Sequence, residues 1–420
     1  MTHDTNDSAA LPRPLEGITI LDLTTALAGP YATLILAGLG ARVIKVENPR
    51  NPDSARTNSP YLGRDGLTVT RQHDDDYSLA MLERGRNKEA VTLNMKSAEG
   101  RALFFDLVKQ ADAVVENFSA GVADRLGIGY AACAEVNPRI VYTAISGFGA
   151  NVQPRQNKAM DNIVQAMSGM MLASGSPGEA PVRVGIPFGD LTAPLFAAIG
   201  TLAALMQARQ TGQGQHVDVS LLGALSALVA AEPFEIMAKL GHQTRSGNFM
   251  ARLAPFGVFP TSDGYISICA PKDDFVSGLF RAMEREDLLQ DPRFNTRDAR
   301  VRNHLELHDM VSAFTRTLTT HDACERLTDF DVPNGPVREP AEALRDPNLL
   351  ARGETTQLMH PAYGAVEDIV VGGLPIRMSG AFTGFDKPAV TLGASNADVY
   401  GGMLGLDAAR IAALAREGVI

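Results

Sequence analysis

The sequence predicts an α/β protein: a large domain on a Rossmann-like parallel sheet, followed by a small α+β domain. In the first half of the chain, short apolar runs with strand character alternate with apolar helical runs, which is typical of a parallel sheet with crossover helices. Residues 18–47 contain a strand, a helix and a second strand, the composition of one βαβ unit. From about residue 241 the pattern changes to a hairpin followed by helices, which indicates a separate small domain.

The first βαβ unit begins with a predicted buried strand at residues 18–23, ITILDL, and ends with another at residues 41–47, ARVIKVE. In the helix between them, Pro30 suits the first helical position and Gly38 suits the end. The turn before this helix reads LAGP and not GxGxxG, so the sequence does not support a dinucleotide-binding turn.

The following elements continue the alternation. Residues 50–80 are polar and are predicted to form a long surface excursion. Further strands are predicted at 90–95, 113–118, 139–149 and 216–220, and long apolar helices at 191–205 and 221–240.

The small domain is predicted from the run FGVFPTSDGYISICA, which is typical of an antiparallel hairpin with a Ser-Asp-Gly turn. Helices follow at 273–286 and 299–318, and short strands around 365–380 precede a terminal helix near 407–417. We therefore divide the chain into a large domain at 1–225, a small domain at 230–330 and a C-terminal segment at 335–420 that returns to the large domain.

Composition excludes several classes of protein. The chain has 420 residues and a net charge of −10, which disfavours a nucleic-acid-binding protein. Its three cysteines are isolated, so we expect neither a disulfide framework nor a zinc site. We expect the protein to be cytoplasmic, where cysteines stay reduced. The first residues are polar and acidic, without the apolar core of a signal peptide. No apolar run reaches the ~18 residues of a membrane span without polar breaks, so no membrane partner is expected.

Two groups of residues are candidates for chemistry. The stretch VGIPFGDLTAPLFAAIGTLAAL holds one carboxylate, Asp190, at the start of an apolar helix. From the residues alone it is either a helix cap or a nucleophile. Arg84, Arg86 and Lys88 form a small basic cluster, which is either a solvated turn or a phosphate contact.

Several motifs, taken in order, resemble those of the family III CoA-transferases. They include PLEGITILDLT, LAGP, LGARVIKVENP, RNKEAVTLNMKSAEGR, ADAVVENFSAGVADRLG, NPRIVYTAISGFG, GDLTAPLFAAIGTLAAL, TGQGQHVDVSLL, APFGVFPTSDGYI and DVPNGPV. The resemblance covers nearly the whole chain. It implies a CoA-binding large domain and a homodimer of interlocked rings. It also implies transfer of CoA from an acyl-CoA to a small carboxylic acid, without a metal or a tightly bound cofactor.

The resemblance also implies roles for single residues. Asp190 matches the catalytic aspartate of the family's Gly-Asp pair, and Asp161 matches an acidic residue near the active site. Asp161 equally suits a helix N-cap. The implied CoA contacts are Ala28, Asn117, Phe118, Arg125 and Lys158, with Arg86 and Lys88 as weaker candidates.

The substrate acids are less defined. Succinyl-CoA is the donor expected from the family. Arg245, Asn248 and Arg252 either reach a second carboxylate of a dicarboxylic acid or form a solvated loop. Departures from the formyl-CoA transferase pattern at Thr25, Leu27 and Asn48 argue against formate and oxalate.

Two other functions remain alternatives. An α-methylacyl-CoA racemase of the same superfamily deprotonates the carbon next to the thioester with a histidine, and that position is Met160 here. A non-catalytic CoA-binding protein could use the same scaffold, although the presence of Asp190 speaks against it.

Overall fold

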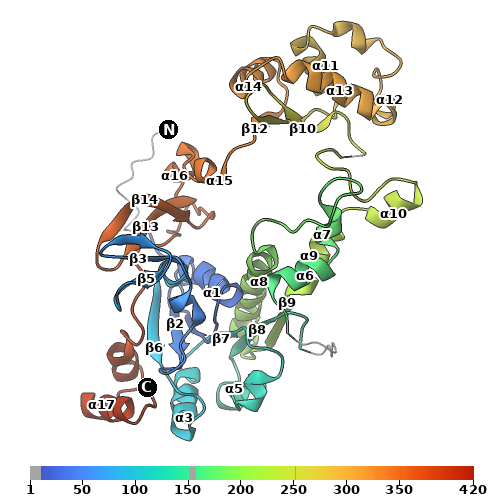
Figure 1. Ribbon diagram of the computed structural model, residues 1–420. Coiled ribbons are helices and arrows are strands. Elements are labelled where there is room, and N and C mark those ends of the chain that lie inside the picture. Colours follow the sequence, from blue (N-terminus) through green and yellow to red (C-terminus); the bar gives the residue numbers. More distant parts are fainter. Residues whose placement is uncertain (1–10, 151–157, 251) are drawn as a thin grey trace. The chain divides into compact units, whose positions relative to one another are not determined.

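The computed structural model describes residues 11–150, 158–250 and 252–420 (Figure 1). The chain forms two compact units. Unit 1 comprises Met1–Ser168, Val184–Leu228 and Leu344–Ile420, and unit 2 comprises Gly169–Arg183 and Val229–Ala343. The segment Gly169–Arg183 groups with unit 2, although the sequence analysis does not assign it to the small domain.

Unit 1 is built on a six-stranded sheet in the order β6-β2-β1-β7-β8-β9, in which every neighbouring pair is parallel. Its strands are β1 (Thr19–Asp22), β2 (Arg42–Glu47), β6 (Lys88–Thr92), β7 (Ala113–Glu116), β8 (Val141–Ser146) and β9 (His216–Ser220). The prediction of an α/β fold with a parallel sheet is therefore confirmed.

Helices cover both faces of this sheet (Figure 1). On one face lie α1 (Ala28–Gly38) and α8 (Phe188–Thr211), which pack on each other, and α8 also packs on β8 and β9. The other face carries the main apolar core, to which α3 (Ala98–Val108), α5 (Tyr130–Val136) and α17 (Ala408–Arg416) contribute. The two layers leave the carboxyl ends of the strands open to the loops that follow them.

Shorter elements complete unit 1. They are η1 (Ser54–Thr57), β3 (Tyr61–Gly63), β4 (Gly66–Thr68), β5 (Tyr77–Ser78), α2 (Leu79–Arg84), α4 (Val122–Arg125), α6 (Asp161–Met167), α9 (Leu221–Val229), α16 (Pro347–Ala351), β13 (Thr355–His360), β14 (Gly364–Gly372) and the π-helical turn η3 (Ala397–Gly401). Strands β4, β3 and β5 form an antiparallel sheet, so the surface excursion predicted at 50–80 contains regular structure that its polar sequence does not reveal.

Unit 2 contains the predicted hairpin, now confirmed as β10 (Phe256–Pro260) antiparallel to β11 (Tyr265–Cys269). The rest of its elements are α7 (Met170–Ala173), α10 (Phe234–Lys239), α11 (Asp273–Ala282), η2 (Glu286–Leu289), α12 (Arg297–Arg302), α13 (His304–Thr315), α14 (Thr320–Asp329), β12 (Asn334–Pro336) and α15 (Pro340–Ala343).

The single helix predicted at 221–240 is wrong. The structure has two helices there, because α9 ends at Val229 and α10 starts after Pro233. Proline lacks the backbone N–H that an uninterrupted helix needs at that position. The helix predicted at 191–205 is longer than expected, running from Phe188 to Thr211.

Helix α8 is long and apolar enough to cross a membrane by length and composition alone. Half of its most apolar window is buried inside the protein, as in the core helix of a soluble domain. The length and composition of α8 are therefore only weak evidence for a membrane span.

A buried ion network lies beneath the loop after β1. Lys88 Nζ contacts Asp22 Oδ2 at 3.0 Å and donates to Pro30 O and Thr33 Oγ1, with both charged side chains at most 1% exposed. Burial alone would raise the pKa of Asp22, but Lys88 and Lys45 outweigh it and lower that pKa to about 2. Lys88 therefore neutralises a buried carboxylate and holds the first turn of α1.

This placement predicts that Lys88→Met destabilises the fold. It leaves Asp22 charged and without its closest cation, which should lower the free energy of unfolding by about 3–5 kcal/mol, measured by urea denaturation. The double variant Lys88→Met/Asp22→Asn should recover part of this loss, since it removes both charges. Full stability of Lys88→Met would contradict the assignment.

Candidate active site

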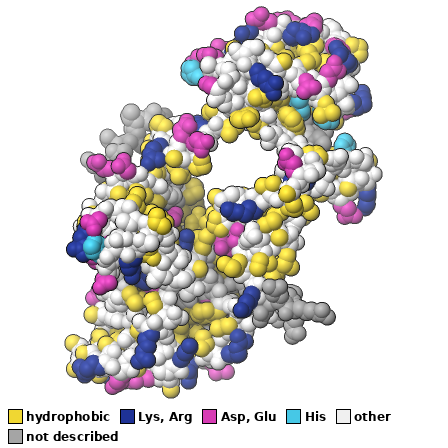
Figure 2. Space-filling view, viewed as in Figure 1, with side chains coloured by type: hydrophobic (Ala, Val, Ile, Leu, Met, Phe, Trp, Pro, Cys, Tyr) yellow, Lys and Arg dark blue, Asp and Glu magenta, His cyan; other side chains and the backbone are white. Residues whose placement is uncertain are grey.

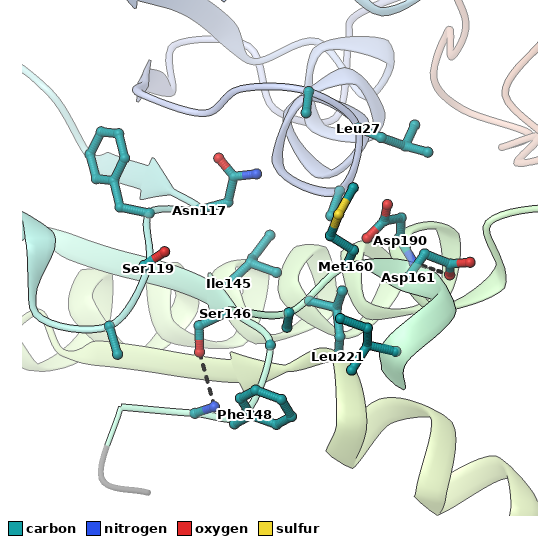
Figure 3. Close-up of a pocket in the computed structure, with 18 of the residues that line it drawn as sticks. Leu27, Asn117, Ser119, Ile145, Ser146, Phe148, Met160, Asp161, Asp190 and Leu221 are labelled. Carbon is teal, nitrogen blue, oxygen red and sulfur yellow. Dashed lines mark hydrogen bonds between the residues drawn. The ribbon is translucent and has the colours of Figure 1, made fainter. Parts of the chain in front are cut away.

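A cavity of about 590 Å³ lies at the carboxyl ends of four neighbouring strands, β1, β7, β8 and β9 (Figure 3). The loops after these strands line it with residues 26–28, 117–120, 145–149 and Leu221, joined by 159–163 and Asp190. Strand order reverses between β1 and β7. Open α/β sheets bind their ligands at such a reversal, outside the carboxyl ends of the strands, so this cavity is the candidate active site.

Two carboxylates meet on one wall of the cavity, at the N-terminus of α8 (Figure 3). Asp161 Oδ1 accepts a hydrogen bond from the N–H of Gly189 at 2.7 Å and a longer one from the N–H of Asp190 at 3.4 Å. Its Oδ2 accepts from Gln165 Nε2 at 2.7 Å. Asp161 thus caps α8, a helix distant in sequence, whereas its own helix α6 has no side-chain cap.

The Asp190 carboxylate is not used as a cap. Helix α8 has Pro187 at its N-cap position and no capping side chain of its own. Within the described residues, the Asp190 side chain makes no hydrogen bond or ion pair, and it faces the cavity beside Asp161 (Figure 3). A half-buried carboxylate without partners is available to react.

The pKa of Asp190 is raised to about 6. Burial is the main cause, and the negative charge of Asp161 adds to it, while Arg84 acts in the opposite direction. Asp190 is therefore ionised at neutral pH, yet more basic than an ordinary aspartate.

Another part of the cavity wall is the turn 26–28, which is held by two contacts. Ala26 has a φ of 65°, a left-handed conformation that a non-glycine residue adopts only when its surroundings enforce it. Asp53 Oδ1 accepts from its N–H at 2.8 Å, and Arg84 Nη1 donates to its carbonyl oxygen at 2.7 Å. These two contacts fix the turn.

Ala28, the first residue of α1, lines the cavity and is buried. The first N–H groups of a helix have no acceptor within the helix, so this helix end offers donors to an anionic oxygen. Gly29 follows it in close contact with Thr24 and Asn117, since a Cβ there would lie 2.3 Å from Thr24 Cβ. Only glycine allows α1 to begin this near the sheet.

Asn117 and Phe118 line the cavity as the resemblance implies. The Asn117 amide accepts from Thr25 N and donates to Thr25 O, each at 2.8 Å, so it also ties the loops after β1 and β7 together. Behind Phe118 lies Glu116, whose carboxylate accepts from the Phe118 N–H at 2.5 Å. Burial raises the pKa of Glu116 to about 7.

Arg125 and Lys158 do not line the cavity. Both are exposed and lie next to lining segments, Arg125 in the turn after Ala120 and Lys158 immediately before Ala159. In the described part of the chain neither side chain forms an ion pair. The roles of Arg125 and Lys158 as CoA contacts stay predictions.

Arg86 and Lys88 lie elsewhere. Arg86 is buried, donates to Glu83 O and Gly372 O at 2.8 Å each, and stacks on the ring of Phe385. Lys88 belongs to the ion network described above. The structure therefore uses both residues in the fold and brings neither to the cavity.

Met160 also lines the cavity and is 73% exposed. No histidine is among the lining residues. Among the described residues, no group of three His, Cys, Asp or Glu side chains could hold a metal ion. The ionisable side chains among the described lining residues are Asp161 and Asp190, and Ser119 and Ser146 add two hydroxyl groups.

The sequence analysis proposed no role at the cavity for three residues that contact its lining segments: Arg84, Asp53 and Glu116. Arg84 was considered only as part of a basic cluster, and Glu116 appeared only within the motif ADAVVENFSAGVADRLG. No local pattern marks Asp53, because its partner Ala26 lies 27 positions away.

Comparisons with known proteins agree along nearly the whole chain. The family model described as CoA-transferase family III matches residues 15–417. The chain is 33% identical to succinyl-CoA–D-citramalate CoA-transferase of Chloroflexus aurantiacus, covering 97% of this chain and 98% of that protein. It is 35% identical to acetyl-CoA:oxalate CoA-transferase of Acetobacter aceti, covering 95% and 97%.

A human relative and a solved structure extend the agreement. Human succinyl-CoA:glutarate CoA-transferase is 30% identical, with 97% of this chain and 90% of that protein covered. The crystal structure of a CAIB/BAIF family protein from Brucella suis matches with a TM-score of 0.79 at 30% identity, over 93% of this chain and 100% of that one. The protein is an enzyme that transfers CoA, and its chain belongs to CoA-transferase family III.

Proposed function

We propose that the enzyme moves CoA from an acyl-CoA donor to a carboxylic acid, with Asp190 as the nucleophile. The observation that carries the proposal is the position of the Asp190 carboxylate. It lies in the cavity at the sheet's switch point, without a hydrogen bond or ion pair of its own among the described residues. CoA is a substrate in this reaction, and no other cofactor is required.

The reaction proceeds in steps that balance without an added proton or electron. An Asp190 oxygen attacks the thioester carbonyl, and the C–S bond breaks to give a mixed anhydride and CoA thiolate. The thiolate then attacks the aspartyl carbonyl carbon, releasing the donor acid and leaving an aspartyl-CoA thioester. The acceptor carboxylate attacks the carbonyl carbon of this thioester, which releases CoA thiolate and forms a second mixed anhydride, between Asp190 and the acceptor. The thiolate then attacks the acceptor's carbonyl carbon in this anhydride, which gives the new acyl-CoA and regenerates Asp190.

The chain's own groups support these steps. The first backbone N–H groups of α1 have no acceptor within the helix, and Ala28 lines the cavity, so they can stabilise the developing oxyanion. Asp161 holds the start of α8 through Gly189, which fixes the backbone of Asp190. By its charge, Asp161 also keeps Asp190 more basic.

The proposed substrates are a CoA thioester, with succinyl-CoA as the donor, and a small acid as the acceptor. Relatives are named for succinyl-CoA with citramalate or glutarate, and one for acetyl-CoA with oxalate. The argument against oxalate from Thr25, Leu27 and Asn48 stays a prediction. A cytoplasmic location is also part of the proposal.

The racemase alternative is weaker because Met160 occupies the position of its histidine, and a thioether cannot exchange protons. Incubation with a chiral 2-methylacyl-CoA in deuterium oxide tests this alternative directly. Deuterium incorporation at the α-carbon would favour the racemase over the transferase.

The homodimer is also proposed. Figure 2 shows hydrophobic side chains gathered where Figure 1 places α6, α8 and α9. On α8, Leu195, Phe196, Ile199 and Met206 are 41–65% exposed, although the helix is otherwise a core element. A contiguous exposed apolar face of this kind marks a contact surface, and we assign it to a second copy of the chain.

Asp190→Asn should lower kcat by at least about 1000-fold, because an amide cannot serve as the nucleophile. Incubation of the wild type with acyl-CoA and then hydroxylamine or borohydride should leave a modified Asp190, detected by peptide mass spectrometry. Intact transfer activity in the variant, or an unmodified Asp190 during turnover, would refute its role.

The pH dependence follows from the raised pKa of Asp190. The reactive form is ionised, so kcat/KM should rise with pH through about 6 and level off above it. Asp161→Asn removes a negative charge beside Asp190 but keeps an oxygen that can accept from the N–H of Gly189. The pKa of Asp190 should then fall, so the rise of kcat/KM with pH should occur at lower pH in this variant. A rise at the same pH as in the wild type would mean that Asp161 acts only as a cap.

Analytical ultracentrifugation should give twice the chain mass of 44.7 kDa. Ile199→Asp should shift the protein towards monomer, since it buries a charge in the proposed interface. Leu305→Asp, at a similarly exposed leucine of α13, is the matched control and should remain dimeric. A monomeric wild type would contradict the proposal.

A further inference from the structure

Arg84 ends α2 directly behind the wall of the cavity formed by the turn 26–28. Its Nη1 donates to the carbonyl oxygen of Ala26 at 2.7 Å, and its Nε is buried without a hydrogen-bond partner. A guanidinium has five N–H donors and no acceptor. Within the described residues only one of these donors has a protein partner, so most of its binding capacity is unused.

Arg84 also lacks a counterion. Three neighbouring basic residues are paired, namely Arg56 with Glu47, Lys45 with Asp53 and Lys88 with Asp22. Arg86 has no ion pair among the described residues and a buried Nη1 without a partner, but its contacts lie away from the cavity. No carboxylate among the described residues lies within ion-pair distance of Arg84, although burial lowers its pKa and Asp190 is near enough to influence it. A partly desolvated cation without a partner is costly to keep, and an anionic ligand would offset that cost.

We propose that Arg84 binds the second carboxylate of a dicarboxylic acyl group while the first carboxyl carbon reacts at Asp190. The inference rests on the proposed function and assigns the residue that would distinguish dicarboxylic from monocarboxylic acids, the former being the acids for which the relatives are named. Arginine suits this role because its planar fork matches a carboxylate in two parallel hydrogen bonds.

The arginines that the sequence offered for this role are engaged in unit 2. Arg245 donates to the carbonyl oxygens of Ser174, Glu179 and Ala180. Arg252 forms an ion pair with Glu232 at 2.9 Å. Arg84 instead belongs to unit 1 together with Asp190, and it contacts the same turn that lines the cavity.

The test measures isotope exchange between a labelled acid and its own CoA thioester, so that donor and acceptor carry the same acyl group. Succinate is compared with butyrate and glutarate with valerate, because each pair has the same number of carbons and differs in the second carboxylate. The enzymes are the wild type, Arg84→Gln, Arg84→Lys and the control Arg139→Gln. Arg139 is exposed just before β8, at the opposite end of the sheet from the cavity.

Arg84→Gln should lower kcat/KM for the diacids by about 10–100-fold, the value of a charge-assisted hydrogen bond. Exchange of butyrate and valerate should fall by a smaller factor, because these acids report only the lost support of the Ala26 turn. For the diacids, Arg84→Lys should fall between the wild type and Arg84→Gln, since it keeps the charge but not the fork. Arg139→Gln should match the wild type with all four acids. The result is expressed as the ratio of diacid to monoacid exchange. A loss of folded enzyme lowers both rates equally, so it does not change this ratio.

Three results would overturn the inference while leaving the proposed function intact. The first is an equal loss for diacids and monoacids, which would make Arg84 only a support for the Ala26 turn. The second is no loss for either class of acid, and the third is a wild type that prefers the monoacids. A wild type that exchanges none of the four acids would overturn the proposed function and this inference together.

Discussion

The geometry of the candidate active site depends on one hydrogen bond, from the N–H of Gly189 to the carboxylate of Asp161. It fixes where α8 begins, and therefore where Asp190, one residue later, faces the cavity. The same contact places two carboxylates side by side in partly buried surroundings, which raises the pKa of Asp190. The capping of α8 and the raised pKa of Asp190 thus both follow from the position of Asp161. A neutral cap on α8 would hold the helix equally well but would leave Asp190 less basic.

The sheet supplies the other half of the site. Because strand order reverses between β1 and β7, the loops after these strands diverge and leave a cavity between them. Asn117 then connects the two loops through both backbone atoms of Thr25. The turn at Ala26 is held by Asp53 and Arg84, and Asp53 is itself paired with Lys45 at 2.8 Å. Charged groups buried under the loop therefore set the geometry of this part of the cavity wall.

The sequence was sufficient for elements whose signal is local. Runs such as ITILDL and HVDVS are short, apolar or β-branched and bounded by turns, and each proved to be a strand of the parallel sheet. It was insufficient where the signal comes from another part of the chain. Lys88 looks like a surface cation, yet it is buried because Asp22, on the neighbouring βαβ unit, lies 3.0 Å away. Asp161 looks like a cap for α6 and instead caps α8. Both cases depend on tertiary contacts that no spacing encodes.

Lys88 and Arg84 lie close together in the sequence but differ in whether the fold provides them with a carboxylate partner. Lys88 is buried and has a carboxylate partner within the fold, whereas Arg84 is half-buried and has no carboxylate partner in the described structure. Replacing a buried ion pair with apolar residues is often neutral for stability, whereas an unpaired buried charge always costs stability. Lys88 is therefore fully explained by the fold, whereas the contact with Ala26 O accounts for only one of the donors of Arg84. Its cost is offset only when an anion reaches the cavity, and a substrate whose acyl group carries a second carboxylate supplies that anion at the side of Asp190. The binding energy gained there is available to position the reacting carboxyl carbon.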